Sequence, residues 1–383
     1  MDFLMSMALT KPTGFWSDII FGMDSVVGNY ALAVILITVI IRLVLSPLDF
    51  LNKINSKKTS RKQAEMKPEL DKINKAYANN KDLLNQKTMQ LYKKYNFNVG
   101  GSCVIMLVYL VVTMVVFFSL FGTLNEISSY KIAEEYVTVS DAYYTTYEET
   151  YNIHNGLYAP TDEGYRANVI QWVNGYLFKT ESEVAALGAD DKTMYDILNT
   201  VKLTADANAN LAYEETRTGF LWIKSIWCND AMWSSPTLSY SDFTKNSQIK
   251  AESITEQEYN VVMDAVRLEH SGMNGLFLLA ILSAASQYAS LKLNTYLSRR
   301  KAEKQGIPVA EDPSSNKTMS IIMPALMGIF PLFYNAAFGI YLVASGLVTI
   351  VTSTITTLVV DNIDAISFKK NKEKNRASYS RKK

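Results

Sequence analysis

The sequence predicts an all-α membrane protein with five transmembrane helices, a cytoplasmic helical hairpin and an enlarged extracellular domain. Its apolar stretches are long enough to cross a bilayer, and charged residues gather between them with alternating sign. The final apolar span is about twice the length of one crossing and is interrupted by Pro331, Asn335 and Gly339, so it is read as two helices. The expected crossings are residues 29–48, 103–124, 274–293, 318–334 and 338–360.

Charge orients these crossings, because short loops rich in Lys and Arg stay in the cytoplasm. Residues 51–100 carry 12 basic and 4 acidic residues, whereas residues 125–271 carry 10 basic and 23 acidic ones. The loop at 294–317 has 5 basic and 3 acidic residues, and residues 368–383 have 8 and 1. We therefore expect the amino terminus outside and the carboxyl terminus in the cytoplasm.

The first 28 residues are expected to form a short amphipathic helix on the outer leaflet. One helical face gathers apolar side chains, and Asp18 and Asp24 lie off that face. We expect no cleavable signal peptide, since no compact cleavage site follows an apolar core of signal-peptide length. The residues of the apolar face are Phe15, Trp16, Ile19, Ile20 and Met23.

Arg42 is the one charged residue inside the first crossing. A cation in the membrane is expensive and is a functional candidate for that reason. The alternative is that its side chain snorkels to the nearer surface, because about one and a half turns of helix separate it from Asp49. The residues of this segment leave both interpretations open.

Residues 49–102 predict two amphipathic helices that join near Asn79 and Asn80 and close as a cytoplasmic hairpin. A basic cluster at its base could contact anionic lipid or ribosomal RNA, or could be a plain solvated face. The cluster consists of Lys57, Lys58, Arg61 and Lys62. Met66, Leu70, Ile73 and Tyr77 share one apolar face, and Leu84, Thr88, Leu91 and Tyr95 share the other.

The outer segment at 125–273 predicts a small folded domain, with a capping box from Thr180 to Glu183. A structural cap and a partner-binding module are both compatible with its residues. The Cys and His residues show no metal-ligand spacing, so we expect no metal and no cofactor. These residues are Cys103, Cys228, His154 and His270.

The carboxyl-terminal tail at 361–383 is a basic extension that follows the last crossing. Such tails bind anionic lipid or ribosomal RNA through phosphate charge, and they also reinforce topology. Its basic residues are Lys369, Lys370, Lys372, Lys374, Arg376, Arg381, Lys382 and Lys383.

Five short motifs follow one another along the chain. They are NYALAVILITVIIRLVLSPL, then AEMKPELDKINKAY with LYKKYNFNVGG, then FFSLF, FLWI at 220–223 and ASGLVTI at 344–350. In this order they resemble the YidC/Oxa/Alb family of membrane protein insertases, in its bacterial, Gram-positive-like form. The resemblance covers about 200 residues, namely the crossings and the hairpin, and leaves most of the outer segment unmatched.

The resemblance implies a five-helix core with a hydrophilic groove that opens to the cytoplasm and to lipid and is closed outside. Arg42 matches the arginine of the family's first core helix, and Tyr341 and Ser345 match a tyrosine and a serine of its last one. Tyr109, Thr113 and Gln287 are further polar candidates for the groove. For these polar residues, ordinary interhelical hydrogen bonding is the alternative.

The chain also departs from the family pattern. Its second crossing lacks the usual proline, the lipoprotein-type cysteine of many Gram-positive members is missing, and so is the large amino-terminal outer domain of Gram-negative members. The extracellular segment is far longer than the usual connection.

The expected function is that of a membrane protein insertase and chaperone in the bacterial plasma membrane, which performs no covalent chemistry. No Walker-type glycine loop suggests nucleotide use. Expected partners are nascent membrane proteins, the ribosome, the Sec translocon and anionic lipids, with a monomeric core. The alternatives are a small secondary transporter, which should show inverted repeats, and a sensor, which should carry a folded cytoplasmic signalling domain. Neither feature is found in the sequence.

Overall fold

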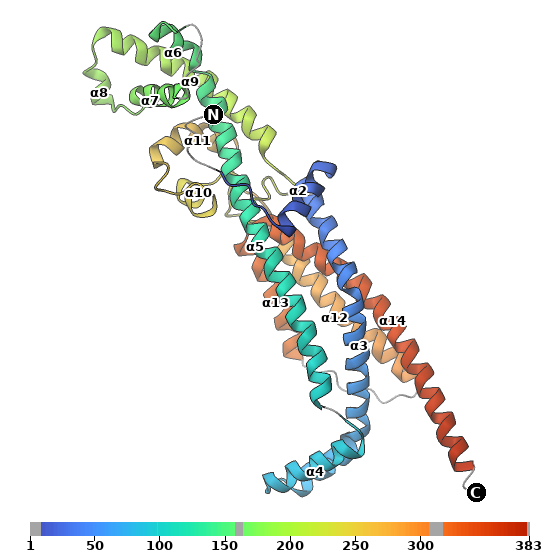
Figure 1. The fold of residues 1–383 in the computed structure, drawn as a ribbon. Coiled ribbons are helices and arrows are strands. Elements are labelled where there is room, and N and C mark those ends of the chain that lie inside the picture. The colour runs from blue at the N-terminus through green and yellow to red at the C-terminus, as the bar shows by residue number, and fades with distance from the viewer. Residues whose placement is uncertain (1–8, 98, 158–163, 306–316, 381–383) are drawn as a thin grey trace. The chain divides into compact units, whose positions relative to one another are not determined.

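The structure is a computed structural model that describes residues 9–97, 99–157, 164–305 and 317–380 (Figure 1). Its described residues form helices and irregular segments, with one isolated β-bridge between Phe220 and Ile223. The helices are α2 (Phe15–Val27), α3 (Tyr30–Ala76), α4 (Lys81–Lys94), α5 (Val99–Thr145), α6 (Glu148–Asn155), α7 (Tyr165–Leu177), α8 (Glu181–Ala185), α9 (Ala189–Thr216), α10 (Tyr240–Asn246), α11 (Glu256–Glu269), α12 (Leu278–Gln305), α13 (Lys317–Phe333) and α14 (Ala336–Ser380).

Three of these helices are long and apolar enough to cross a membrane. The qualifying parts are Tyr30–Gln63 of α3, Val104–Thr145 of α5 and Ala336–Ile363 of α14. A shorter apolar helix, Pro324–Phe333, lies within α13, and α12 begins at Leu278 inside the crossing expected at 274–293. The all-α membrane class is thus confirmed, whereas the full number of five crossings stays a prediction.

The three long helices continue beyond the crossings that the sequence suggested. α3 runs from the membrane segment into the first arm of the hairpin, and it accommodates Pro47 and Pro68. α5 extends to Thr145 and so supplies the first element of the outer segment, and α14 continues to Ser380. The sequence boundaries marked where polarity changes, and a change of polarity does not end a helix when the following residues are good helix formers.

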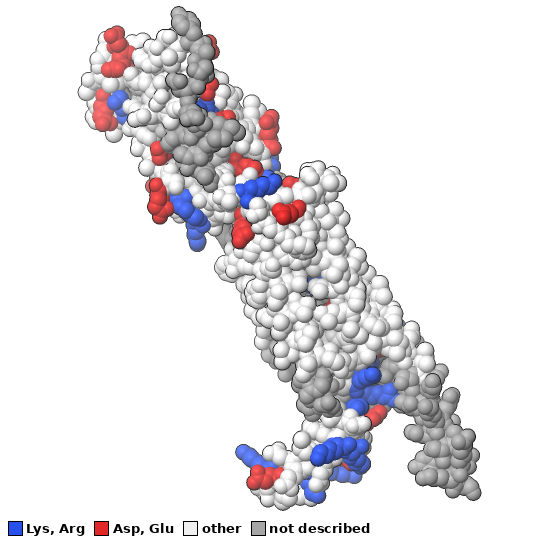
Figure 2. Space-filling view, viewed as in Figure 1, with Lys and Arg blue, Asp and Glu red and all other residues white. Residues whose placement is uncertain are grey.

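The chain divides into two compact units, of which the membrane unit comprises residues 34–119, 279–330 and 339–383. Its helices carry many exposed apolar side chains, such as Val104, Leu107 and Val115 on α5, which suits contact with lipid. Figure 2 shows the surface of these helices as nearly free of charge, while Lys and Arg gather on the hairpin of α3 and α4.

Small residues allow close helix packing within this unit. A Cβ atom added at Gly346 of α14 would lie 2.8 Å from the Cβ of Ser286 on α12. One added at Gly328 of α13 would lie 2.9 Å from the Cβ of Ala284. Such close approach of backbones is how membrane helices gain van der Waals contact when water no longer drives them together.

The hairpin arms are joined by polar contacts as well as apolar ones. Met66 and Leu91 are buried, and the Asn80 side chain caps α4 by accepting a hydrogen bond from the Leu83 amide at 3.1 Å. Lys94 forms an ion pair with Glu69 at 2.7 Å, and the Tyr95 hydroxyl donates to the same carboxylate at 2.8 Å. The hydrogen bonds from Lys94 and Tyr95 hold the pKa of Glu69 below its usual value.

The second unit, named the outer domain after the position that the sequence predicts for it, comprises residues 1–33, 120–278 and 331–338. The part of α5 beyond Leu120 is a central element of this domain, since Ile127, Val139 and Tyr143 are fully buried. An aromatic cluster joins α5 to α10 and α11: the Tyr136 and Tyr259 rings stack at 5.3 Å and the Phe243 and Tyr259 rings at 4.7 Å. The capping box predicted at Thr180 and Glu183 is confirmed.

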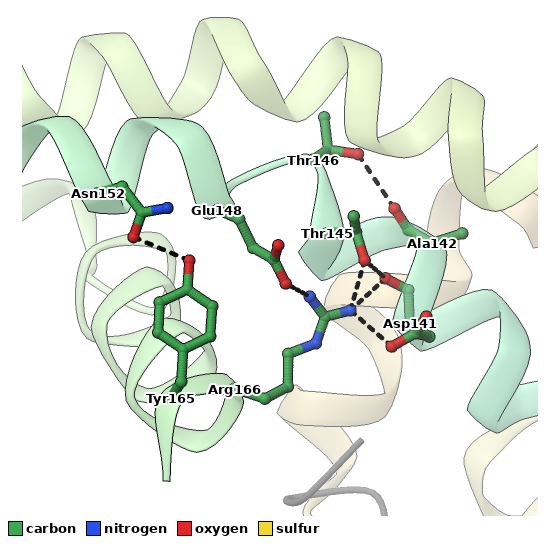
Figure 3. A network of polar contacts seen from close by, with 8 residues as sticks. All are labelled: Asp141, Ala142, Thr145, Thr146, Glu148, Asn152, Tyr165 and Arg166. Atoms are coloured by element: carbon green, nitrogen blue, oxygen red, sulfur yellow. Dashed lines mark hydrogen bonds and ion pairs between the residues drawn. The ribbon is translucent and has the colours of Figure 1, made fainter. Parts of the chain in front are cut away.

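A buried guanidinium ties α7 to the end of α5 (Figure 3). Arg166 pairs with Glu148 and, at 2.7 Å, with Asp141, and it also donates to the Thr145 hydroxyl at 2.7 Å. The Arg166 side chain is buried while both carboxylates remain partly exposed. The two carboxylates compensate the positive charge of the buried guanidinium. Next to it, the Tyr165 hydroxyl donates to Asn152 at 2.9 Å.

The buried side-chain amide of Asn274 is one of the groups that hold the segment between α9 and α10. Asn274 is 0% exposed, accepts from the Ser225 amide at 2.8 Å, and donates to the carbonyls of Ser225 at 2.8 Å and Asn229 at 3.0 Å. Leu221 lies in the same segment with a φ of 53° and is exposed. The fixed side of this loop therefore faces Asn274, and the turn at Leu221 projects an apolar side chain.

The amphipathic segment predicted near the amino terminus is helical as α2. Ile20 is fully buried within the outer domain, while Phe15 on the same helix is exposed. The Gly28 residue that ends α2 has a φ of 67°, a left-handed conformation that suits glycine. Its position on the outer leaflet stays a prediction.

Candidate functional site

The candidate site is centred on Arg42 of α3. Its Nε atom donates to the Ser345 hydroxyl on α14 at 3.0 Å, and a second guanidinium nitrogen contacts the same oxygen. Ser345 is 2% exposed, so this end of the guanidinium is fixed in the helix interface. The guanidinium has five N–H donors and remains fully charged, so one hydroxyl leaves donor capacity unused.

No carboxylate among the described residues forms an ion pair with Arg42. This is unusual for a partly buried cation, because a charge held in apolar surroundings is stabilised most by an opposite charge. The guanidinium consequently carries its positive potential into the interface with a neutral partner only. It is suited to attract an anionic group that arrives from elsewhere.

Other predicted site residues surround this pair. Tyr341, one turn before Ser345, is buried, and both Tyr341 and Tyr109 lie within electrostatic range of Arg42. On α12, the amide nitrogen of Gln287 lies 3.6 Å from where a Cβ would stand at Gly346. The structure thus brings Arg42, Tyr109, Tyr341 and Ser345 together from three helices, and Gln287 of α12 lies against α14 beside Gly346.

Thr113 takes a different part. Its hydroxyl donates to the carbonyl of Tyr109 at 2.9 Å, within its own helix α5. This back-bond satisfies the hydroxyl locally, as Ser and Thr often do inside helices. A role in a groove therefore stays a prediction for Thr113.

A second polar layer, which the sequence reading did not identify, lies further along α3. Lys53 donates to the Thr357 hydroxyl at 2.5 Å, to the Ser353 carbonyl at 3.3 Å and to Asn294 at 3.4 Å. Asn294 in turn donates to the Ser353 hydroxyl at 2.8 Å and accepts from Thr357 at 2.8 Å. These contacts link α3, α12 and α14 around one ammonium group.

A third layer follows one turn later. The Lys57 ammonium lies 2.7 Å from Asp361, whose side chain is only 5% exposed. Between the first and second layers, Tyr109 of α5 lies near Asp49 of α3. Arg42, Lys53 and Lys57, here called the cationic ladder, therefore place three positive charges along α3.

The spacing of the partners is a signal that could have revealed these layers. Ser345, Ser353, Thr357 and Asp361 recur at multiples of four along α14, and Ser290 and Asn294 do so on α12. Residues four apart share one helix face, so each series forms a polar stripe that faces another helix. Taken one at a time, these polar residues only interrupt the apolar runs of α12 and α14, and the stripe is visible only from their common spacing.

The basic cluster of the hairpin is only partly free for other partners. Lys57 is engaged by Asp361, Arg61 pairs with Glu65 at 3.3 Å, and Lys62 donates to the Asn96 carbonyl at 2.5 Å. Lys58 is exposed. Contact of these residues with a ribosome or with lipid stays a prediction. The backbone of the basic tail belongs to α14 up to Ser380. The structure does not describe the side chains from Lys369 to Arg376, nor any part of Arg381, Lys382 and Lys383.

Comparison with known proteins shows that part of the chain is similar in sequence to a known family. Residues 22–155 match the family model of the 60Kd inner membrane protein. A stretch of 102 residues is 38% identical to the membrane protein insertase YidC of Fusobacterium nucleatum and covers 27% of this chain and 46% of that protein. Part of this chain is therefore similar to the YidC insertases.

Further YidC insertases are also similar in sequence to parts of this chain. The YidC insertase of Clostridium tetani is 43% identical over 75 residues, which make up 20% of this chain and 32% of that protein. The YidC insertase of Rickettsia prowazekii is 35% identical over 123 residues, or 32% of this chain and 20% of that protein. The chain thus spans less than half the length of these relatives, and no solved structure matches it.

The extent of the YidC match decides what it supports. Arg42, the hairpin and the whole of α5 lie within the residues 22–155 that match the family model, whereas Gln287, Tyr341 and Ser345 lie beyond them. The similarity to the family model therefore rests on the part of the chain that contains the first two long helices. The joining of Arg42 to the last helix is a finding of the structure.

Proposed function

We propose that this chain is a membrane protein insertase that moves polar segments of newly made membrane proteins across the bilayer without nucleotide hydrolysis. The observation that carries the proposal is Arg42, a cation within the first crossing helix whose hydrogen-bond partner is the neutral Ser345. Two comparisons support it: residues 22–155 match the 60Kd inner membrane protein model, and the YidC relatives are named as insertases.

The physical difficulty of insertion lies in the polar tail of the substrate. Each unsatisfied peptide or charged group that enters hydrocarbon costs several kcal/mol. A hydrophilic groove open to the cytoplasm and to lipid shortens the dry path. Arg42 at its inner end attracts acidic groups of the tail, since a charge between low-dielectric walls acts more strongly than one in water.

The cationic ladder extends this idea toward the hairpin. Lys53 lies about 16 Å along the helix axis from Arg42, and Lys57 about 6 Å further. Lys53 is surrounded by amide, hydroxyl and carbonyl groups and Lys57 is paired with Asp361, so the ladder becomes less neutralised toward Arg42. An acidic tail would meet its least compensated cation at the end of this path.

Once the tail has crossed, the apolar segment of the substrate leaves sideways into lipid. Burial of apolar surface is favourable by about 25 cal/mol per Å², which is enough to drive the step without ATP. In this proposal the amino terminus lies outside, the carboxyl terminus lies in the cytoplasm, and the protein acts as a monomeric core alone or with the Sec translocon. The basic tail and the hairpin receive ribosomes or anionic lipid through phosphate charge.

Reconstitution in liposomes tests the proposal. A newly made single-span protein with an acidic outer tail should insert without ATP, and insertion is measured as protection of the tail from external protease. Arg42→Ala should slow insertion several-fold and Arg42→Lys should largely restore it. Val44→Ala, which alters an exposed apolar residue half a turn away, is the matched control.

A change at Ser345 separates charge from shape. Ser345→Asp supplies the carboxylate that Arg42 lacks, so it should reduce the preference for acidic over neutral tails as much as Arg42→Ala does. Ser345→Ala should leave that preference in place. Full-rate insertion of acidic tails by Arg42→Ala or by Ser345→Asp would refute the proposed role of the guanidinium.

The tail and the ribosome form a separate test. Removal of residues 368–383 should weaken co-sedimentation with ribosomes more at low salt than at high salt, because phosphate contacts are screened by ions. Unchanged co-sedimentation at low salt would remove the tail from the proposal.

A further inference from the structure

The outer domain contains a large cavity that the insertion mechanism above does not use. Its volume is about 1240 Å³, larger than the usual range for small-molecule sites. The continuation of α5, the loop before α10, the ends of α10 and α11 and residues 333–335 line it. All of these segments belong to the same compact unit.

The floor of the cavity is preformed. The carbonyl of the lining residue Leu238 accepts a hydrogen bond from the Tyr259 hydroxyl at 2.9 Å. The carbonyl of Pro236, which lies between two lining residues, accepts one from the Tyr213 hydroxyl at 2.9 Å. Asn229 donates to the Leu332 carbonyl at 3.2 Å, and the Asn274 amide fixes the loop from behind. A ligand would therefore meet a surface whose ordering cost is already met by the fold.

The lining is rich in small hydroxyl and amide side chains and is balanced in charge. Ser128, Ser235, Thr237 and Asn335 are examples of the former. The charged lining residues are two acids and two bases, namely Asp242, Asp264, Lys245 and Arg267. A balanced lining does not favour phosphate or another strong anion, whereas hydroxyl and amide groups can both donate to and accept from neutral peptide groups.

The rim of the cavity carries exposed apolar side chains. Trp233 is 69% exposed, Phe333 is 71% exposed and Leu268 is 78% exposed, and all three line the cavity. Large apolar side chains left open beside a polar recess mark an interaction site, and Trp is among the residues that most often dominate binding energy. The combination fits a ligand with a repeating polar backbone and varied side chains.

We infer that this cavity binds an extended polar segment of polypeptide, and that the segment is the substrate tail after it has crossed the membrane. The inference rests on the proposed insertase function for the identity of the tail. Hydrogen bonds from the floor would take the peptide groups, and the rim would contact side chains without demanding one sequence. Temporary binding there would oppose backward sliding of the tail.

Photo-crosslinking tests the inference in the full-length protein. A photoreactive amino acid replaces Ser235 in the floor, and a substrate is halted after its tail has crossed. The tail should crosslink at Ser235, and Trp233→Ala should lower the yield about fivefold or more. A photoreactive group at Ser182, an exposed residue of α8 in the same domain, is the matched control and should give little product.

Direct binding distinguishes failure of this inference from failure of the insertase proposal. The purified full-length protein is titrated with a synthetic polar peptide of the tail sequence and, separately, with a neutral linear oligosaccharide. Peptide binding that is weakened by Trp233→Ala supports the inference even if insertion fails. Insertion that proceeds with neither a crosslink at Ser235 nor peptide binding overturns the inference alone, and binding of the oligosaccharide in place of the peptide also overturns it.

Discussion

The Asn274 amide offers a quantitative test of how the outer domain is held together. Asn274→Ala removes three hydrogen bonds, two with Ser225 at 2.8 Å and one with the Asn229 carbonyl at 3.0 Å. Each such bond contributes roughly 0.5–1.5 kcal/mol, and a buried group that loses its partner costs about 1–3 kcal/mol. Since Ser225 is itself buried, the expected loss of local stability is about 3 kcal/mol.

Amide hydrogen exchange in the full-length protein measures this loss directly. A change of about 3 kcal/mol corresponds to roughly a hundredfold faster exchange, so protection at Ser225 and along the 219–230 loop should fall by that factor. The matched control is Asn155→Ala, because Asn155 is exposed and its amide donates only to the Tyr151 carbonyl of its own helix. The control should change protection of the loop little.

Exchange of the loop at the original rate in Asn274→Ala would refute the reasoning. It would mean that water or a rearranged loop replaces the lost partners at little cost. A loss confined to peptides far from residues 219–230 would contradict it as well, since the three bonds join Asn274 to that loop alone.

Three further predictions concern helix packing, pH and the ladder. Gly346→Leu should separate α14 from α12, because a side chain at position 346 meets Ser286. Cysteine crosslinking between the two helices in membranes should therefore fall, and adding Ser286→Gly in a double variant should partly restore it. Burial and the charge of Arg217 lower the pKa of His270. The contribution of neutral His270 to stability is therefore present above the usual pKa of histidine and is lost as the pH falls through the lowered pKa of the folded protein. His270→Phe should flatten the fall in the denaturation midpoint between about pH 7 and pH 5, and an unchanged slope would contradict this. Asp361→Asn leaves Lys57 without its carboxylate and should destabilise α14 around residue 361. Faster exchange of the amides there measures the loss, and an unchanged exchange rate would show that the ion pair contributes nothing.

The sequence was sufficient for features that depend on neighbouring residues. Apolar runs located the long helices, the Thr180 capping box is visible as a local motif, and the cost of a cation in an apolar run singled out Arg42. Each of these inferences needs only residues within a few turns of one another. Helix ends were harder, because α3, α5 and α14 pass through changes of polarity without a break.

Features that depend on distant residues were not foreseen. Lys53 and Thr357 are 304 positions apart, and Lys53 and Asn294 are 241 apart. Periodicity shows that a helix has a polar face, but it does not say which other helix that face meets or in which register. The outer cavity is harder still, since its lining comes from several separate segments with no common motif.

Lys57 and Arg42 lie on the same helix but have partners of different charge. Lys57 forms an ion pair with Asp361, whose side chain is 5% exposed, and this ion pair joins α3 to α14. Arg42 lies beside a hydroxyl that is 2% exposed, which fixes the guanidinium in direction without reducing its charge. A lysine at position 42 would keep the charge and three N–H donors, which is why Arg42→Lys should largely restore insertion, whereas the arginine adds a planar fork with five donors in fixed directions. An acid at position 345 would compensate this charge, so attraction of a passing anion by Arg42 requires a neutral residue there.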